Sequence, residues 1–536
     1  MTAIFNKSVF ASAVFAAFMG LSSQSAFGQA SSVDELDREL VQTAAPMLLE
    51  YYEAAGFAPV FAGNQKRMTA LLTALEGAEA HGLPVWGGVI EALERAILEA
   101  ASPGGFTNLE LVAAKAYVEF ATALSSGLLN PNDISPLINF DTLRPEPADL
   151  LVMAADSQGN GALYEALEPQ DPSYNALQAE LAALTRDLAQ SGRLVRIPAG
   201  RTLRPGADSE RILAVRQRLT GLGYEGVEGD SSLYDPALVA ALEAFQADHN
   251  LNADGIIGPK TLIALNTGPE ARIQQVIVNL ERRRWLNREL GARHILVNQA
   301  SYMGYVVDNG QPTLVTRVVV GMSNAKYQTP EFIDNMTHMV VNPSWFVPQS
   351  IASEEYLPRL LRDPSVLARE NIVMTVRGTG QPVDARLIDL SQYSQRNFPF
   401  NLRQVPGRSN ALGRVKFMFP NQYNIYLHDT PAKSLFNRET RAYSHGCVRV
   451  QRPFDLAYTL LAPQSDDPQG TFTSVLNSGR ETRIDLVTPV PIYLTYQTVF
   501  LDESGELAYR VDIYERDGLV FDALAENGVA LPEVTS

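Results

Sequence analysis

Hydrophobic residues recur with helical spacing in the first part of the chain. The pattern i, i+3, i+4, i+7 places apolar side chains on one face of an α-helix. Two stretches with this character contain Met68, Leu71, Leu72 and Leu75, and Leu177, Leu181, Leu184 and Leu188. Residues 31–195 are therefore predicted to form a helical domain, in which these stripes make the core.

A second and shorter helical pattern covers residues 206–268. Its apolar positions are Ile212, Val215 and Leu219 in one predicted helix, and Val239, Leu242 and Phe245 in another. Pro259 begins a third helix, because its fixed φ and missing N–H suit the first helical position. Residues 194–205 contain Pro, Gly and several Arg, which is typical of a linker. The pattern predicts a small three-helix domain after this linker.

The pattern changes to strand-like alternation near residue 290. Residues 302–308 and 313–321 are β-rich, and Asn309-Gly310 between them is a strong hairpin signal. Further strands are predicted at residues 295–298, 339–342, 415–419, 424–428 and 447–450. Residues 290–490 are expected to form a mostly β domain, and residues 491–536 to add a β hairpin and tail to it. The fold class is multidomain α+β.

The first 28 residues have the organisation of a secretory signal peptide. Lys7 precedes an apolar run over residues 9–21, and Ala26-Phe27-Gly28 is a small-x-small cleavage site. The run is shorter than the about 20 residues of a spanning helix, and no later segment is long and apolar enough. We therefore expect an exported, periplasmic protein without a transmembrane span after signal removal.

Length and charge narrow the possible functions. The chain has 536 residues, which suggests three or four domains at about 150 residues each. Its formal net charge is −17. An acidic protein is a poor partner for nucleic acids and for anionic membranes. We therefore expect the protein to bind neither nucleic acid nor an anionic membrane.

Cys447 is the only cysteine of the chain, so it cannot form an internal disulfide. Three interpretations remain: a nucleophile, a small buried residue, or a zinc ligand together with His428 and His445. In a strand over residues 447–450, Cys447 and Arg449 would share one face. The alternation at residues 424–428 likewise places Tyr426 and His428 together, on the solvent side of a strand.

A nucleophilic thiol needs a base or a cation nearby, because a pKa of about 8.5 leaves only about 3% thiolate at pH 7. His428 lies 19 positions before Cys447 and His445 only two. We expect His428, on its own strand, to be the general base and acid. His445 and Gly446 are expected to shape the turn, where backbone N–H groups form an oxyanion hole. No paired-cysteine or H-E-x-x-H spacing favours zinc, so neither a metal nor another cofactor is expected.

These residues carry a resemblance to a known family. His428, fifteen residues (429–443), and then Ser444-His445-Gly446-Cys447-Val448-Arg449 resemble the signature of the YkuD-type L,D-transpeptidases. Residues 342–348 and 280–285 resemble segments of the large YcbB-like members from Gram-negative envelopes. The D-G-x-x-G-P-x-T sequence at 254–261 resembles the end of a peptidoglycan-binding domain type 1. In YcbB-like proteins the region matching residues 31–195 is a helical scaffold domain.

The resemblance implies a function. Family members attack a tetrapeptide stem with meso-diaminopimelate third and D-Ala fourth, release D-Ala from a cysteine thioester, and form a 3→3 cross-link. Carbapenems are expected to acylate the same cysteine. The implied partners are peptidoglycan stem peptides and glycan, with cell-wall synthases or an envelope protein as further candidates. Predicted substrate-binding residues are Ser444, Tyr426, Arg449 and Trp345, although a core position for Trp345 stays open.

One further segment, residues 350–412, interrupts the predicted β domain. It begins with a helical pattern over 351–361 and continues as a polar stretch with Gly and Pro. Long insertions beside active sites often act as lids. YcbB-like enzymes carry a capsule subdomain at the matching place. We expect the segment to gate substrate access, with a disordered decoration as the alternative.

Two other functions stay open. A cysteine peptidase or amidase would trim stems with the same Cys and His, but papain-like enzymes place Cys before His in the chain, unlike Cys447 and His428. A noncatalytic wall-binding scaffold would require that this pair is vestigial.

Overall fold

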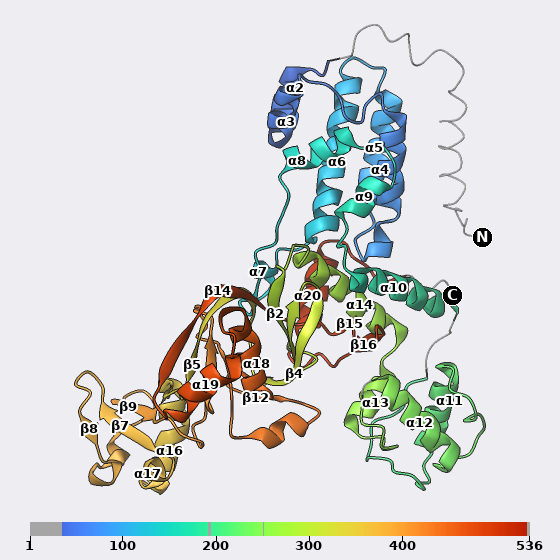
Figure 1. The fold of residues 1–536 in the computed structure, drawn as a ribbon. Coiled ribbons are helices and arrows are strands. Elements are labelled where there is room, and N and C mark those ends of the chain that lie inside the picture. Colours follow the sequence, from blue (N-terminus) through green and yellow to red (C-terminus); the bar gives the residue numbers. More distant parts are fainter. Residues whose placement is uncertain (1–34, 191–194, 250, 533–536) are drawn as a thin grey trace. The chain divides into compact units, whose positions relative to one another are not determined.

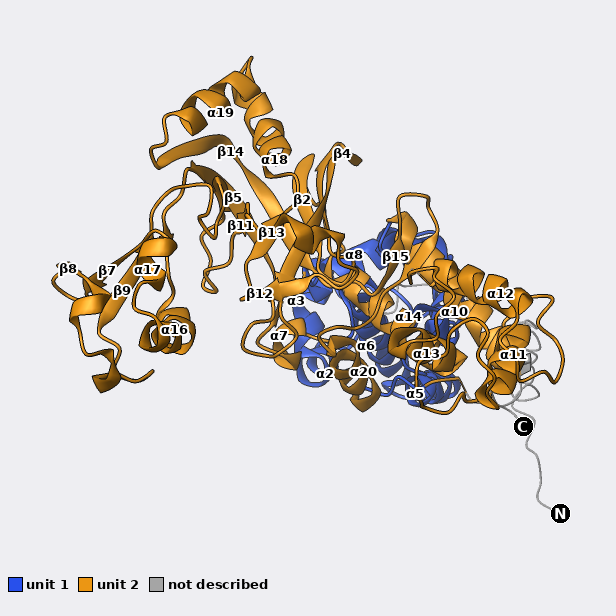
Figure 2. Cartoon of the chain, turned by 90° about the horizontal axis from the view of Figure 1, so that it is seen from below, with its two compact units in different colours: residues 1–128, 143–170, 527–530 blue, residues 129–142, 171–526, 531–536 orange. Residues whose placement is uncertain are grey.

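The computed structural model describes residues 35–190, 195–249 and 251–532. The predicted signal peptide, residues 1–28, lies outside this range. Within it, no helix is both long and apolar enough to cross a membrane. The chain divides into two compact units, one of residues 1–128, 143–170 and 527–530, and the other of residues 129–142, 171–526 and 531–536 (Figure 2).

The first unit is helical, as predicted. Its helices are α2 (Arg38–Ala44), α3 (Leu49–Ala54), α4 (Gln65–Glu76), α5 (Gly87–Glu99), α6 (Gly105–Ser126), α8 (Pro147–Asp156) and α9 (Ala162–Leu167). Figure 1 shows α4, α5 and α9 alongside α6, whose many alanines allow close packing. Met68, Leu71 and Leu75 are buried in this core, which confirms the helical stripe.

A buried carboxylate fixes the centre of this unit. Glu110 on α6 is fully buried and accepts hydrogen bonds from the Tyr52 hydroxyl at 2.6 Å and from the N–H groups of Val60, Phe61 and Ala62 at 2.7–2.8 Å. Burial of a carboxylate is costly unless such donors satisfy it. Glu110 therefore ties α3 and the loop that follows it to α6.

The second predicted stripe lies on α10 (Pro172–Gln190), where Leu177, Leu181 and Leu188 are buried. This helix packs along α14 (Pro269–Trp285), and the Tyr174 hydroxyl accepts a hydrogen bond from Arg284 at 3.2 Å. The structure thus places α10 in the second unit and divides the predicted helical stretch 31–195.

The three-helix segment is present in the second unit. It consists of α11 (Arg211–Gly221), α12 (Pro236–Asp248) and α13 (Pro259–Asn266) around its own core, which contains Ile212, Leu219, Leu242 and Phe245. Pro259 occupies the first position of α13, as the sequence indicated.

Most of the second unit surrounds one closed sheet. Its circuit runs through β5 (Glu331–Val341), β10 (Val415–Met418), β11 (Leu427–His428), β13 (Val448–Val450), β4 (Gln311–Gly321), β3 (Met303–Asp308), β2 (Arg293–Asn298) and β14 (Thr482–Thr495). Because β14 pairs with both β2 and β5, the sheet closes on itself. Val448 and Val450 face its core, so Arg449 between them faces the other way.

The C-terminal region is partly as predicted. β15 (Val499–Leu501) and β16 (Leu507–Tyr509) form the expected hairpin, but as a separate two-stranded sheet. Helix α20 (Arg516–Glu526) follows and was not predicted. It inserts Arg516, which donates to Glu331 at 3.0 Å, while Arg282 donates to the same carboxylate at 2.6 Å. This buried ion pair network holds α20 against the domain.

The insertion is a folded subdomain, and the alternative of a disordered decoration is wrong. It has helices α15 (Gln349–Ile351), α16 (Leu357–Arg362) and α17 (Val366–Arg369), a π-helix, η3 (Ala352–Tyr356), and a sheet of β6 (Trp345–Phe346), β9 (Phe400–Gln404), β7 (Ile372–Val376) and β8 (Pro382–Val383). It has its own hydrophobic core. Because β6 pairs with β9, the subdomain begins before residue 350.

Candidate active site

Cys447 ends a tight turn between β12 (Ala442–Ser444) and β13. The Ser444 hydroxyl donates to the Cys447 carbonyl at 2.5 Å and accepts from the Gly446 N–H at 3.1 Å. Gly446 has a φ of +112°, a conformation that favours glycine. Ser444 is buried and uses its hydroxyl within the turn, so its place in the structure is to hold the turn.

A second loop, residues 321–329, braces this turn. The Thr329 hydroxyl donates to the Gly446 carbonyl at 2.7 Å and accepts from the Gly321 N–H at 2.9 Å. The Met322 N–H donates to the Ser444 carbonyl at 2.9 Å. These contacts fix the backbone on both sides of the cysteine before any substrate binds.

The Cys447 thiol is half-buried and lies near the segment that leads into β11. It donates to the Asn424 carbonyl, with 3.7 Å between sulfur and oxygen. Burial raises the pKa of Cys447 to about 11, against the opposing effects of hydrogen bonds from Tyr426 and of the charges on Arg449 and Lys416. The free thiol is therefore protonated at neutral pH.

His428 lies in a row of basic side chains across three neighbouring strands. It pairs with Arg449 in the parallel register of β11 and β13, and with Lys416 in the antiparallel register of β11 and β10. Burial, the Arg449 charge and the Lys416 charge lower the pKa of His428 to about 3. The side chain is only 4% exposed, so the expectation of a solvent-facing ring is wrong.

The tautomer of His428 follows from its backbone contact. Its Nδ1 lies 2.5 Å from the Asp429 carbonyl, which can only accept, so Nδ1 carries the proton and Nε2 can accept one. The Asp429 carboxylate in turn accepts from the N–H groups of Arg414 at 2.9 Å and Thr430 at 2.7 Å and from Lys433 at 2.6 Å. Asp429, whose carbonyl orients the imidazole, is thus itself fixed by these three hydrogen bonds.

Neither Lys416 nor Arg449 forms an ion pair with a carboxylate of the described residues, and the Arg449 Nε is buried without a hydrogen-bond partner. Burial lowers the pKa of both side chains. Lys416 also lies 5.7 Å from the Tyr426 ring centre. Unpaired cations beside a thiol can stabilise its thiolate and can accept an anionic group of a ligand.

His445, the other candidate base, is engaged elsewhere. Its Nε2 pairs with Glu355 of η3 at 2.5 Å, and its ring packs edge-on against Tyr327 at 4.5 Å. The neighbouring Glu354 pairs with Lys326 and accepts from the Tyr327 hydroxyl at 3.1 Å. The insertion thus contacts the turn that carries Cys447 through Glu355, and the bracing loop 321–329 through Glu354.

Tyr426 and Trp345, which were both predicted to bind substrate, lie in different parts of the domain. Tyr426 lies close to both Cys447 and His428, with ring centres of Tyr426 and His428 5.7 Å apart. Trp345 is half-buried and packs on the core of the insertion, 6.4 Å from the Tyr356 ring. Within the described residues, no group of three or more His, Cys, Asp and Glu side chains is placed to hold a metal ion.

The sequence analysis missed Lys416, Thr329 and Glu355. Lys416 had a signal, because it alternates with Val415 and Phe417 in a predicted strand and thus lies on the polar face, as His428 does. Thr329 and Glu355 had no such signal in the sequence, since each reaches the turn from a distant part of the chain.

Three family models match this chain. They are "L,D-transpeptidase catalytic domain" (YkuD) over residues 292–492, "Scaffold domain" over 47–181, and "Putative peptidoglycan binding domain" over 208–265. The first match contains the whole site described above.

Two known proteins are similar in part. A protein of Haemophilus influenzae named "Putative L,D-transpeptidase" is 35% identical over 223 residues, which is 42% of this chain and 44% of that protein. The chain therefore matches less than half of that relative's length. The second is an L,D-transpeptidase from Xylanimonas cellulosilytica, known from a crystal structure. The match covers 55% of this chain and 98% of that chain, with 15% sequence identity and a TM-score of 0.16. A score this low carries no argument.

Proposed function

We propose that this protein forms 3→3 cross-links in peptidoglycan, because residues 292–492 match the L,D-transpeptidase catalytic domain (YkuD) and the same chain matches a peptidoglycan-binding domain and a scaffold domain. The observation that carries the proposal is the position of Cys447 beside the His428 row inside this domain. The donor would be a tetrapeptide stem with diaminopimelate third and D-Ala fourth.

In the first half-reaction the Cys447 thiol gives its proton to His428 Nε2 while sulfur attacks the carbonyl carbon at the L-centre of diaminopimelate. Both groups are neutral beforehand, since the pKa of Cys447 is about 11 and that of His428 about 3. Proton transfer thus accompanies attack. His428 then protonates the departing D-Ala amine, the C–N bond breaks, and a thioester remains.

In the second half-reaction the side-chain amine of another diaminopimelate attacks the thioester. His428 takes a proton from this amine, and the C–S bond breaks to return the Cys447 thiol. Backbone N–H groups of the turn at His445, Gly446 and Cys447 would hold the oxyanion in both steps. In the free protein the Gly446 N–H donates to Ser444, so this donor would have to exchange partners.

Substrate recognition would use the unpaired cations. Arg449 and Lys416 flank His428 in the strand register, and both charges act on the Cys447 thiol. Neither forms an ion pair with a carboxylate among the described residues, which suits a carboxylate of the donor stem. Tyr426, beside the thiol, would contact the same end of the donor. Trp345 would border the substrate path from the insertion.

The insertion would act as the lid. Glu355 contacts His445, two residues before Cys447, and the contact joins two separately folded cores. A subdomain held in this way can open and close over the site without disturbing the sheet. We place the protein in the periplasm, on the cell wall, with a cleaved signal peptide and with carbapenems acylating Cys447.

The test is muropeptide analysis. Purified residues 29–536, and the variants Cys447→Ala and His428→Ala, would be incubated with diaminopimelate-containing tetrapeptide stems. We expect 3→3 dimers with the unmodified protein and none with either variant. Tripeptides without dimers would instead identify a peptidase. An inert protein that still binds sacculi would identify a noncatalytic scaffold.

A further inference from the structure

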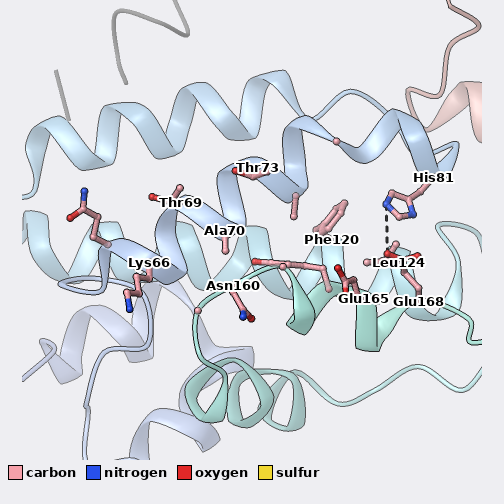
Figure 3. Close-up of a pocket in the computed structure, with 16 residues that line it drawn as sticks. Lys66, Thr69, Ala70, Thr73, His81, Phe120, Leu124, Asn160, Glu165 and Glu168 are labelled. Carbon is pink, nitrogen blue, oxygen red and sulfur yellow. Dashed lines mark ion pairs between the residues drawn. The ribbon is translucent and has the colours of Figure 1, made fainter. Parts of the chain in front are cut away.

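The first unit contains an open cavity of about 620 Å³ that the proposed reaction does not use (Figure 3). Its walls are α4 and α9 with the loop before α9, and its floor is α6. The volume lies within the range of about 300–1,000 Å³ that small-ligand pockets occupy. None of its lining residues belongs to the catalytic domain.

The cavity is apolar below and polar along its sides. Phe120 and Leu124 form the floor, and Tyr164 borders it from α9. Thr69 and Thr73 on α4 are exposed one helical turn apart, and Asn160 is exposed on the opposite side. Such a surface suits a chain with apolar parts and regularly spaced hydrogen-bonding groups.

The two ends carry opposite charges. Figure 3 shows Lys66 at one end, and Glu165 and Glu168 with His81 toward the other. His81 and Glu168 form an ion pair at 4.0 Å, which closes that end. The side chains of Lys66 and Glu165 are exposed and form no ion pair with any described residue. A free ammonium and a free carboxylate thus face the two ends of one groove.

The distance between the ends sets the length of a ligand. Lys66 in the first turn of α4 and Gly77, the residue that follows this helix, both line the cavity. They lie eleven positions apart, or about 16 Å at 1.5 Å per residue. An extended peptide rises about 3.3 Å per residue, so about five residues would span the groove.

We propose that this cavity binds a short extended peptide whose carboxylate lies at Lys66 and whose ammonium lies at Glu165. A neutral glycan would leave both charges unused, which is why a zwitterionic peptide fits better. The charges of the ligand follow from the cavity alone. Only the choice of a peptidoglycan stem peptide as the probe rests on the proposed function.

The experiment is calorimetry of the full chain carrying Cys447→Ala, so that no turnover occurs, with the five-residue stem peptide L-Ala-γ-D-Glu-meso-diaminopimelate-D-Ala-D-Ala as the probe. In this background, Lys66→Met and Glu165→Gln should each weaken binding about twofold to fivefold, the effect of losing one exposed ion pair. Arg95→Met and Glu91→Gln, at exposed positions of α5 outside the cavity, are the matched controls and should bind unchanged.

Hydrogen exchange with mass spectrometry would locate the ligand. We expect the pentapeptide to protect residues 65–77 and 159–168, and expect Lys66→Met to reduce that protection at a subsaturating peptide concentration. A pentapeptide with amidated carboxylates should bind weakly and be insensitive to Lys66→Met. Protection confined to residues 415–449, equal binding by all variants, or no binding would each overturn the proposal. The outcome is independent of cross-linking, because all proteins lack Cys447.

Discussion

Arg449 lies directly opposite His428 in the parallel pairing of β11 and β13. Lys416 occupies the corresponding place on the other side of His428, in β10. The imidazole is thus flanked by two cations, which together with burial keep it neutral. The same cations favour the thiolate of Cys447. One arrangement therefore acts on both the imidazole of His428 and the thiol of Cys447.

Removal of the Lys416 charge should make the thiol less reactive. The Lys416 cation stabilises the thiolate, so Lys416→Met should raise the pKa of Cys447 above its value of about 11. A pKa higher by one lowers the thiolate fraction at pH 9 about tenfold. Because Cys447 is the only cysteine, the alkylation rate with iodoacetamide between pH 8 and 11 measures this directly. The rate curve should move to higher pH.

Arg386→Met is the control for this experiment. Arg386 is an exposed arginine of the insertion that pairs with Asp384, away from the thiol. Its variant should react as the unmodified protein does. A Lys416→Met curve that coincides with both would show that Lys416 does not act on the thiolate.

Loss of the Ser444 hydroxyl should loosen the turn. Ser444→Ala removes the partners of the Gly446 N–H and of the Cys447 carbonyl. Buried groups without partners cost about 1–3 kcal/mol, so we expect that loss in the free energy of unfolding, together with slower acylation. Chemical denaturation and the rate of D-Ala release would measure the two effects. Ser478→Ala, at the end of α19 (Pro468–Asn477), is the control; an equal loss there would remove the special role of Ser444.

Weakening the contact between the insertion and the turn should affect long substrates only. Glu355→Gln removes the charge that faces His445. We expect KM for sacculi to rise about threefold to fivefold, while KM for a free tetrapeptide stays the same, because only a polymer would reach the insertion. Deletion of residues 350–412 should impair turnover of polymer further. Asp363→Asn breaks an ion pair inside the insertion and serves as the control. Equal effects on both substrates would contradict the lid.

Asp517 should make stability depend on pH. Burial and the charge of Asp512 raise the pKa of Asp517 from 3.8 to about 7. Between these values the folded protein holds a proton that the unfolded chain has lost, so the free energy of unfolding falls as pH rises from about 4 to 7. The full effect is on the order of 4 kcal/mol.

Asp517→Asn cannot titrate and should lose this dependence. Thermal unfolding of both proteins from pH 4 to 8 would test it. As pH rises, the Tm of the variant should increase relative to the Tm of the unmodified protein. Parallel curves would show that the carboxylate titrates normally in the folded protein.

Local patterns in the sequence determined much of this protein. The stripe at residues 68–75, the alternation at residues 302–321 and the Asn309-Gly310 turn predicted helices, strands and a hairpin that the structure contains. Asn309 and Gly310 both have positive φ, as the turn type requires. Such elements depend on neighbours a few residues apart, so the sequence records them directly.

The candidate site was predictable only in part. The single cysteine and its spacing from His428 pointed to the chemistry, and the alternation at residues 447–450 predicted the shared face of Cys447 and Arg449. The burial of His428 and the approach of Lys416 were not foreseen. Both depend on which strands pair and in which register.

Tertiary structure alone decided the rest. Glu355 reaches His445 from 90 positions away, and Arg282, Glu331 and Arg516 meet in one buried cluster from three separate elements. Periodicity says which face of an element is apolar, but not which distant face covers it. The sequence therefore determined the elements and pointed to Cys447, whereas the pairing of distant strands and the docking of the insertion determined the electrostatics around its thiol.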